Sequence, residues 1–132
     1  MKLKDICPIC YEFPNSHSVD KICEITGVCM LYTKPSAAKK YDDQAGILSH
    51  VNNMLISLKG KKWEWTIDGE GFSMKHALEV TTTQKILDII LKGYMDSLVK
   101  IKIVNMNRAL KQMHSAVKPF IGSKLNHKLV WE

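Results

Sequence analysis

The chain has 132 residues, of which 45% are hydrophobic and 24% are charged, so it is long enough to bury the core of one domain. Its longest apolar runs are a few residues, far short of the ~20 residues that cross a membrane. The first five residues also lack the apolar stretch of a secretory signal. We therefore expect a soluble, cytoplasmic protein.

The charge is positive but consists almost entirely of lysine. The formal net charge is +6, and Arg108 is the single arginine among 19 basic residues. Recognition of bases and phosphates favours the planar arginine fork, so we expect no specific binding of nucleic acid. Scattered lysines instead give a diffuse positive field. This field predicts at most weak contact with an anionic membrane surface.

The four cysteines lie in the first quarter of the chain, and two of them form a C-x2-C turn of the kind that begins many zinc sites. A histidine and a third cysteine would complete a zinc set of Cys7, Cys10, His17 and Cys23. A second ligand pair of the usual spacing is missing from the sequence, so we predict free thiols and no bound metal. The zinc site and a disulfide are the alternatives.

The chain divides into a cysteine-containing N-terminal arm, residues 1–26, and an α/β domain, residues 27–132. Short apolar or aromatic runs that end in turn residues predict strands at 28–32, 63–67, 99–104 and 128–131. Apolar residues spaced three and four apart predict helices between them. The first of these helices begins after a cap at Asp42 or Asp43 and ends at Gly60. The second spans residues 81–97 and the third spans residues 107–117.

Strands that alternate with helices predict a mostly parallel β-sheet with crossover helices. In such sheets ligands bind beyond the carboxyl ends of the strands, here at residues 32–34, 68–71 and 105–107. The serines lie in no nucleophile motif and have no obvious histidine partner, and His76 and His114 are equally well explained as half-buried helix residues. We therefore predict that the protein is not an enzyme, has no catalytic residues and needs no cofactor.

Three segments resemble a known family. Residues 65–76 resemble the I-x-D-x-x-G-x-x-x-x-H segment of CRAL-TRIO lipid-binding domains, and residues 94–105 resemble the Y-P-E-R-L-x-x-I-x-I-V-N segment. Residues 117–130 resemble the ending I-K-P-F-L…K-I, and residues 17–28 more weakly resemble the first strand. The resemblance implies a CRAL-TRIO-like α/β fold, here a miniature without the family's N-terminal helical subdomain and C-terminal segment.

The resemblance also implies a pocket for a phospholipid or other small hydrophobic molecule. Strands would form its floor and the third helix, 107–117, would form its cover. Flexible methionines suit a lining that adapts to irregular apolar shapes. The residues predicted to bind the ligand are Trp65, Ile67, Phe72, Ile103, Met106, Leu110, Met113, Val117 and Phe120.

A second hypothesis is an interaction module. A miniature domain could keep the fold and lose lipid transfer, and the apolar surface left uncovered would then bind a protein partner or a second copy of the chain. The alternative function is therefore a protein-interaction scaffold or a homodimer.

Overall fold

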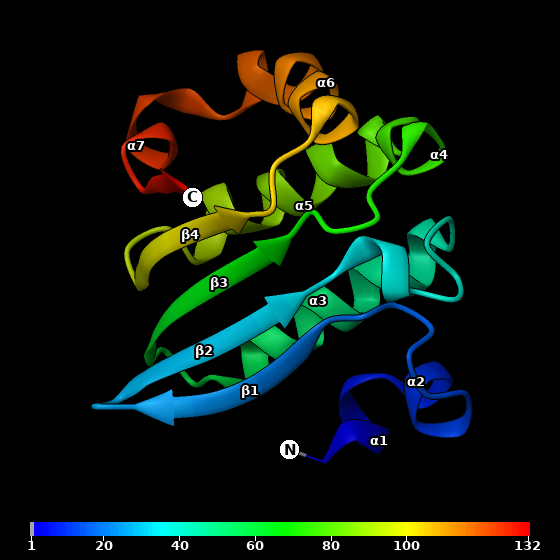
Figure 1. Cartoon of the computed structure of the whole chain (residues 1–132). Coiled ribbons are helices and arrows are strands. Elements are labelled where there is room, and N and C mark those ends of the chain that lie inside the picture. The colour runs from blue at the N-terminus through cyan, green and yellow to red at the C-terminus, as the bar shows by residue number, and fades with distance from the viewer. Residues whose placement is uncertain (1) are drawn as a thin grey trace.

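A single five-stranded sheet organises the structure, a computed structural model that describes residues 2–132. The strands lie in the order β1-β2-β3-β4-β5 (Figure 1). The pair β1–β2 is antiparallel, and the pairs β2–β3, β3–β4 and β4–β5 are parallel. The strands are β1 (Asp20–Ile25), β2 (Val28–Thr33), β3 (Lys62–Asp68), β4 (Leu98–Val104) and β5 (Leu129–Trp131).

The three long helices connect neighbouring parallel strands. They are α3 (Gln44–Ser57), α5 (Val80–Gly93) and α6 (Arg108–Val117). Right-handed crossovers that each move one strand in the same direction place their helices on the same face of the sheet. Figure 1 shows α3 and α5 behind the strands, and α6 packs against α5.

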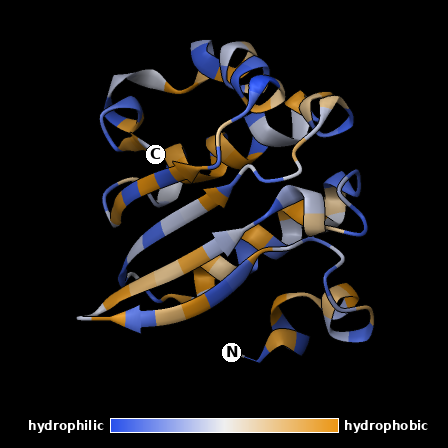
Figure 2. Cartoon of the chain, in the orientation of Figure 1, coloured by the Kyte–Doolittle hydropathy of each residue, from blue (hydrophilic) through white to orange (hydrophobic). Residues whose placement is uncertain are grey.

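Alternation along the strands separates the two faces of the sheet. In β3 the two tryptophans Trp63 and Trp65 are buried, whereas Glu64 between them is half-buried. In β4 Ile101 and Ile103 are buried on either side of a half-buried lysine. Because side chains point to opposite faces in turn, one face forms the core beneath the helices and the other carries polar groups. Figure 2 shows hydrophobic and hydrophilic residues in alternation along β4.

Side-chain caps fix where two of the long helices begin. Asp43 accepts a hydrogen bond from the backbone N–H of Gly46 at 3.2 Å, and Asn107 accepts one from Leu110 at 3.0 Å. Shorter helical segments complete the chain. They are α1 (Leu3–Ile6), α2 (Pro8–Glu12), η1 (Pro35–Ala37), α4 (Met74–Ala77), η2 (Lys118–Phe120) and α7 (Gly122–Asn126).

The predicted sheet with crossover helices is confirmed, and each predicted strand and long helix is present. The second helix was predicted to run to residue 97 but ends at Gly93, because Tyr94 leaves the helical conformation. The pattern of apolar residues did not predict strand β1, and only the weak resemblance of residues 17–28 to the family's first strand pointed to it. This strand extends the sheet into the predicted arm, 1–26. All six of its residues are exposed, so its sequence has no alternation between core and solvent. The division of the chain after residue 26 stays a prediction.

Within residues 2–132, no helix combines the length and the apolar character needed to traverse a lipid bilayer.

The position of α6 depends on Asn107, which also donates from Nδ2 to the carbonyl oxygens of Gly69 and Phe72, at 2.9 and 3.1 Å. We expect Asn107→Ala to lower the free energy of unfolding by about 2 kcal/mol, since it removes a helix cap and two further hydrogen bonds. Asn107→Asp keeps the acceptor and should lose about half as much. Urea denaturation measures both variants, and a loss below ~0.5 kcal/mol for the alanine variant would contradict this role.

Candidate functional site

An apolar cavity of ≈ 210 Å³ lies between the sheet and helices α5 and α6. Strands β3 and β4 supply its floor, and the last residues of the chain close one side. The polar residues in its lining are Thr33, Thr83 and His114. The apolar lining residues are Pro35, Trp65, Ile67, Phe72, Ile86, Leu87, Ile90, Ile101, Ile103, Leu110, Met113, Val117, Ile121, Leu129 and Trp131.

The structure brings most of the predicted ligand-binding residues to this cavity. Those that line it are Trp65, Ile67, Phe72, Ile103, Leu110, Met113 and Val117. Two predicted residues lie elsewhere: Met106 packs half-buried against the core, and Phe120, in η2, is 52% exposed. Contact between these residues and a ligand stays a prediction.

Sequence reasoning missed two walls of the cavity. One wall comes from α5, through Ile86, Leu87 and Ile90, and the other comes from the segment after α6. The apolar positions of α5 cover a face too wide for packing on the sheet alone, and this width was the available signal. The short C-terminal strand gives no such signal. Its three residues are too few for a pattern that predicts which face of the sheet Leu129 and Trp131 line.

The loop after β3 approaches α6 closely. A Cβ atom on Gly69 would lie 2.6 Å from the carbonyl oxygen of Asn105 and 2.7 Å from Cδ2 of Leu110. Only a residue without a side chain fits at this distance. The close approach places Phe72 and Leu110 in the same wall of the cavity.

One polar group of the lining has no partner. Nε2 of His114 is buried and makes no hydrogen bond within residues 2–132. The imidazole packs edge-on against Trp131, with ring centroids 4.5 Å apart. Burial lowers the pKa of His114, and the nearby Lys118 lowers it further. The imidazole is therefore neutral near pH 7 and can still donate or accept one hydrogen bond.

A smaller cavity of ≈ 110 Å³ adjoins the first. The two share Trp65, Phe72 and Met113 in their linings. The smaller one extends past Tyr41 and His76 toward the N-terminal segment.

At the carboxyl ends of the strands, the predicted ligand positions form an internal polar network around Asp68. Tyr32 donates a short hydrogen bond to Oδ2 of Asp68, Asn105 donates to Oδ1 at 2.8 Å, and the backbone N–H of Glu70 donates to Oδ1 at 2.9 Å. The hydrogen bond from Asn105, followed by that from Tyr32, lowers the pKa of Asp68. The same carboxylate raises the pKa of Tyr32 to about 12.

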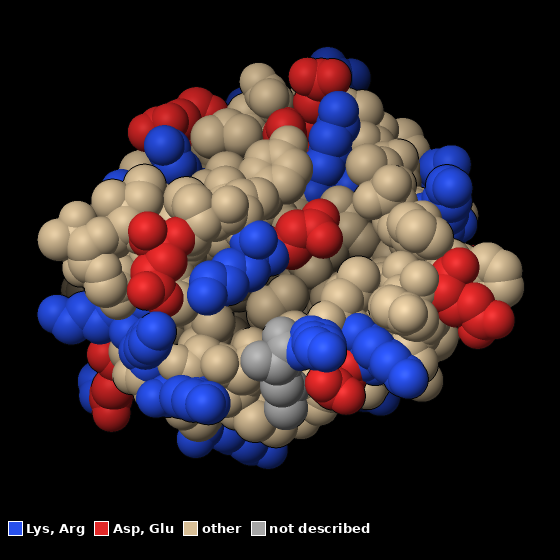
Figure 3. Space-filling model, turned by 90° about the horizontal axis from the view of Figure 1, so that it is seen from below, with Lys and Arg blue, Asp and Glu red and all other residues tan. Residues whose placement is uncertain are grey.

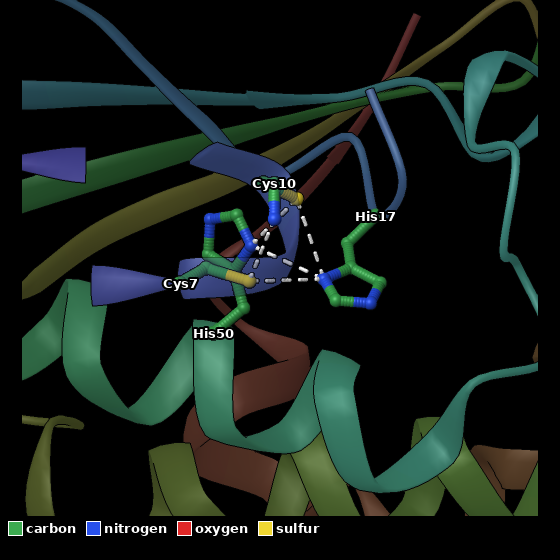
Figure 4. A group of neighbouring side chains, drawn as sticks. All are labelled: Cys7, Cys10, His17 and His50. Carbon is green, nitrogen blue, oxygen red and sulfur yellow. Dashed lines mark hydrogen bonds between the residues drawn. The ribbon is translucent and has the colours of Figure 1, made fainter. Parts of the chain in front are cut away.

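A second group of functional side chains surrounds the C-x2-C turn (Figure 4). Cys7, Cys10 and His17, three members of the zinc set that the sequence left as an alternative, lie together, but Cys23 is not among them and is exposed on β1. The fourth side chain of the group is His50, which points out from α3. All four residues of this group are buried.

Burial shifts the pKa of two side chains of this cluster, Cys10 and His50. Burial raises the pKa of the Cys10 thiol to about 11, and burial lowers the pKa of His50 to about 4. His17 donates from Nε2 to Oδ2 of Asp43 at 2.8 Å, and this hydrogen bond lowers the pKa of Asp43. The sequence offered one signal for His50: it lies one turn after Ile47 and one turn before Met54 on the buried side of α3.

These features define a mostly parallel α/β domain with a partly open apolar cavity beside its last long helix. A family model described as CRAL/TRIO domain matches residues 19–131, and the chain belongs to that family. The family binds lipids or small hydrophobic molecules in general, and its proteins are generally ligand-binding or transfer proteins rather than enzymes. No curated protein matches the chain.

The network around Asp68 predicts a dependence of stability on pH. Because the folded-state pKa of Asp68 is lowered, its stabilising effect is complete above its ordinary pKa and is lost as the pH falls through the folded value. We expect Asn105→Ala to raise the pKa of Asp68 toward its ordinary value, and Tyr32→Phe to raise it less. Carbon-13 NMR of the carboxyl group measures these shifts.

Asp68→Asn should also reduce the fall in unfolding free energy below about pH 4. The control is Asp96→Asn, at an exposed position, which should leave this fall unchanged. An unchanged Asp68 pKa in both network variants would contradict the assignment.

Proposed function

We propose that the protein binds a lipid or another small hydrophobic molecule, without catalysis, in the cavity between the sheet and α6. The observation that carries this proposal is an apolar cavity of ≈ 210 Å³ whose floor is the core face of the sheet. Its cover is one face of α6, through Leu110, Met113 and Val117. General ligand binding by the family supports the same function.

The volume favours a small ligand or one part of a larger one. Apolar cavities of about 150 Å³ stay free of water and bind molecules the size of benzene. Pockets that enclose a whole drug-sized ligand usually measure about 300–1,000 Å³. A cavity of ≈ 210 Å³ therefore fits a compact hydrophobic molecule or the end of an acyl chain. Each buried methylene group contributes about 0.8 kcal/mol to binding.

The lining also indicates the chemistry of the ligand. A purely apolar ligand would leave the buried Nε2 of His114 without a hydrogen bond, which costs free energy. A ligand with one hydroxyl, carbonyl or carboxyl group beside its hydrocarbon part would satisfy this nitrogen. We therefore propose an amphipathic ligand with a single polar group near His114.

The polar residues near the cavities support a non-catalytic function. Ser73 and His76 lie 3.1 Å apart between Oγ and Nδ1, as in some nucleophilic sites. However, Nδ1 of His76 also accepts the backbone N–H of Ser73 at 3.0 Å, so the pair forms the cap of α4. His76 therefore has its base nitrogen occupied by a structural contact.

The surface charges support at most a diffuse contact with anionic membranes. Figure 3 shows lysine side chains interspersed with aspartate and glutamate on the face seen from below. Several lysines pair with acids, as in Lys34–Glu70 and Lys61–Glu24, both at 3.2 Å. Exposed pairs of this kind are weak and salt-sensitive. Any attraction to an anionic surface should therefore be weak.

The alternative, an interaction scaffold or homodimer, has one feature in its favour. Strand β1 is an edge strand whose six residues are all exposed, including Ile22 and Ile25. An open edge can pair with another strand, but charged side chains discourage such pairing. Lys21 and Glu24 lie on this strand and form an ion pair at 3.7 Å. The apolar cavity therefore carries the proposed function better than this edge does.

Filling the cavity tests its function. Met113→Trp places a larger side chain into the lining, and we expect it to weaken uptake of a fluorescent fatty acid at least about tenfold, equal to ~1.4 kcal/mol. Gln112→Trp is the matched control, because Gln112 is the exposed neighbour on the same helix. Unfolding curves check that both variants fold. Equal uptake by a folded Met113→Trp variant and the wild type would count against the cavity.

The polar contact has its own test in the selectivity for ligands. His114→Leu removes the imidazole, and we expect the preference for 1-octanol over octane to fall about three- to tenfold, the value of one hydrogen bond. Competition against the same fluorescent fatty acid measures both affinities. An unchanged preference would show that the ligand's polar group lies elsewhere.

A further inference from the structure

We propose that Cys7, Cys10, His17 and His50 form a tetrahedral zinc site that joins the N-terminal segment to helix α3. Cys7 comes from the turn between α1 and α2, and Cys10 comes from α2 itself. His17 comes from the loop before β1, and His50 comes from the middle of α3 (Figure 4). One ligand atom from each residue lies within 4.8 Å of all the others.

Four of the six distances between these atoms match the edges of a zinc tetrahedron, and the other two are within 4.8 Å. Zinc bonds of about 2.3 Å to sulfur and 2.0–2.1 Å to nitrogen give about 3.3 Å between two nitrogens and about 3.5 Å between nitrogen and sulfur. Nδ1 of His17 and Nδ1 of His50 are 3.4 Å apart. The Sγ–Nδ1 distances are 3.4 Å for Cys7–His17, 3.4 Å for Cys10–His17 and 3.5 Å for Cys10–His50.

Hydrogen bonds within the cluster cannot account for this geometry. Nδ1 of His17 has two sulfurs and a second imidazole nitrogen within 3.4 Å. A neutral ring nitrogen has one lone pair or one proton, so it satisfies a single partner. A cation at the centre would instead accept one lone pair from each of the four ligands, and two thiolates with two imidazoles are a usual zinc set.

The surroundings of His17 fit the role of a metal ligand. Its second nitrogen, Nε2, contacts Oδ2 of Asp43 at 2.8 Å, which fixes the orientation of the ring. A carboxylate behind a ligand histidine is a common support in zinc sites. Asn15 and Ser18 on either side of it adopt left-handed backbone conformations, with φ of 66° and 53°, so the loop turns sharply around His17. Asp43 is therefore a positioning residue, which would hold the His17 ring in the orientation that the metal needs.

The metal would act as a structural link. Helices α1 and α2 have four and five residues, too few to be stable in isolation. Within residues 2–18, direct hydrogen bonds to α3 include the one from Nδ2 of Asn53 to the carbonyl oxygen of Ile6, at 3.0 Å. Zinc binding contributes directly to folding free energy in small sites of this kind. The N-terminal segment should therefore be ordered by the metal.

The competing interpretation is a reactive cysteine. The thiol of Cys7 contacts the imidazole of His17, which in turn contacts the carboxylate of Asp43, as in a catalytic triad. A nucleophilic thiol must be accessible to its substrate. Cys7 and Cys10 are only 3% and 5% exposed, and neither lines the adjoining cavity. A catalytic triad also needs only one thiol and one imidazole, whereas Cys10 and His50 add a second of each at the same point.

Metal content and cobalt spectroscopy test the proposal. Full-length protein purified without chelators should contain about one zinc per chain by mass spectrometry. After zinc is exchanged for cobalt, the visible absorption should be that of a tetrahedral ion with sulfur-to-cobalt charge transfer. Cys7→Ser and His50→Asn should lose this spectrum and most of the metal. Cys23→Ser, the matched control, should keep both, which separates this site from the set that includes Cys23.

Cobalt binding by the wild type keeps the test decisive where a ligand variant fails to fold. Less than about 0.2 zinc per chain together with no tetrahedral cobalt spectrum would overturn the proposal, as would loss of metal in Cys23→Ser but not in His50→Asn. Another metal in the purified protein that zinc cannot displace would also overturn it. Asp43→Asn should weaken zinc affinity about 10- to 100-fold and keep the cobalt spectrum, as a positioning role requires.

Discussion

The structure depends on the crossover connections between its parallel strands. A parallel neighbour requires a crossover, and successive crossovers in the same direction put α3, α5 and α6 on one face of the sheet. That face must be apolar, and the strands supply it through Trp63, Trp65 and their neighbours. The apolar cavity is a consequence of the same arrangement, because α6 spans the floor of β3 and β4 without filling the space above it.

Polar contacts hold the walls of the cavity in place. Asn107 joins the start of α6 to the loop after β3, and Gly69 lets this loop approach the helix. The Asp68 network lies beside them at the ends of the strands. The strand ends, where a ligand was expected by general rule, therefore serve as supports, and the apolar space lies next to them over the core face.

The elements that sequence could predict are those with a repeating pattern of burial. Buried and less buried residues alternate along the tryptophan-rich strand, and buried residues recur every three or four positions in helix 107–117. The ends of both elements were therefore predicted to within a few residues. Strand β1 is exposed on both faces and has no pattern. Phe120 was among the residues predicted to bind the ligand. Its side chain is exposed instead, and sequence does not specify the direction taken after Pro119.

Long-range contacts set a similar limit on the cysteine cluster. Its first three members, Cys7, Cys10 and His17, lie close in sequence and were grouped by spacing alone. The fourth, His50, lies 40 residues beyond Cys10, and only the packing of the N-terminal segment on α3 brings them together. Cys23 had suitable spacing but belongs to the edge strand. A histidine on the buried face of a helix was the available clue.

The central claim is that a hydrophobic ligand occupies the cavity between the sheet and α6. Methyl NMR of protein labelled at Ile, Leu, Val and Met, titrated with a medium-chain fatty alcohol, tests it most directly. The account predicts saturable shifts at Ile103, Leu110 and Met113, which line the cavity. Shifts confined to exposed methyl groups such as those of Ile22 and Ile25, or no saturable shifts at all, would contradict it.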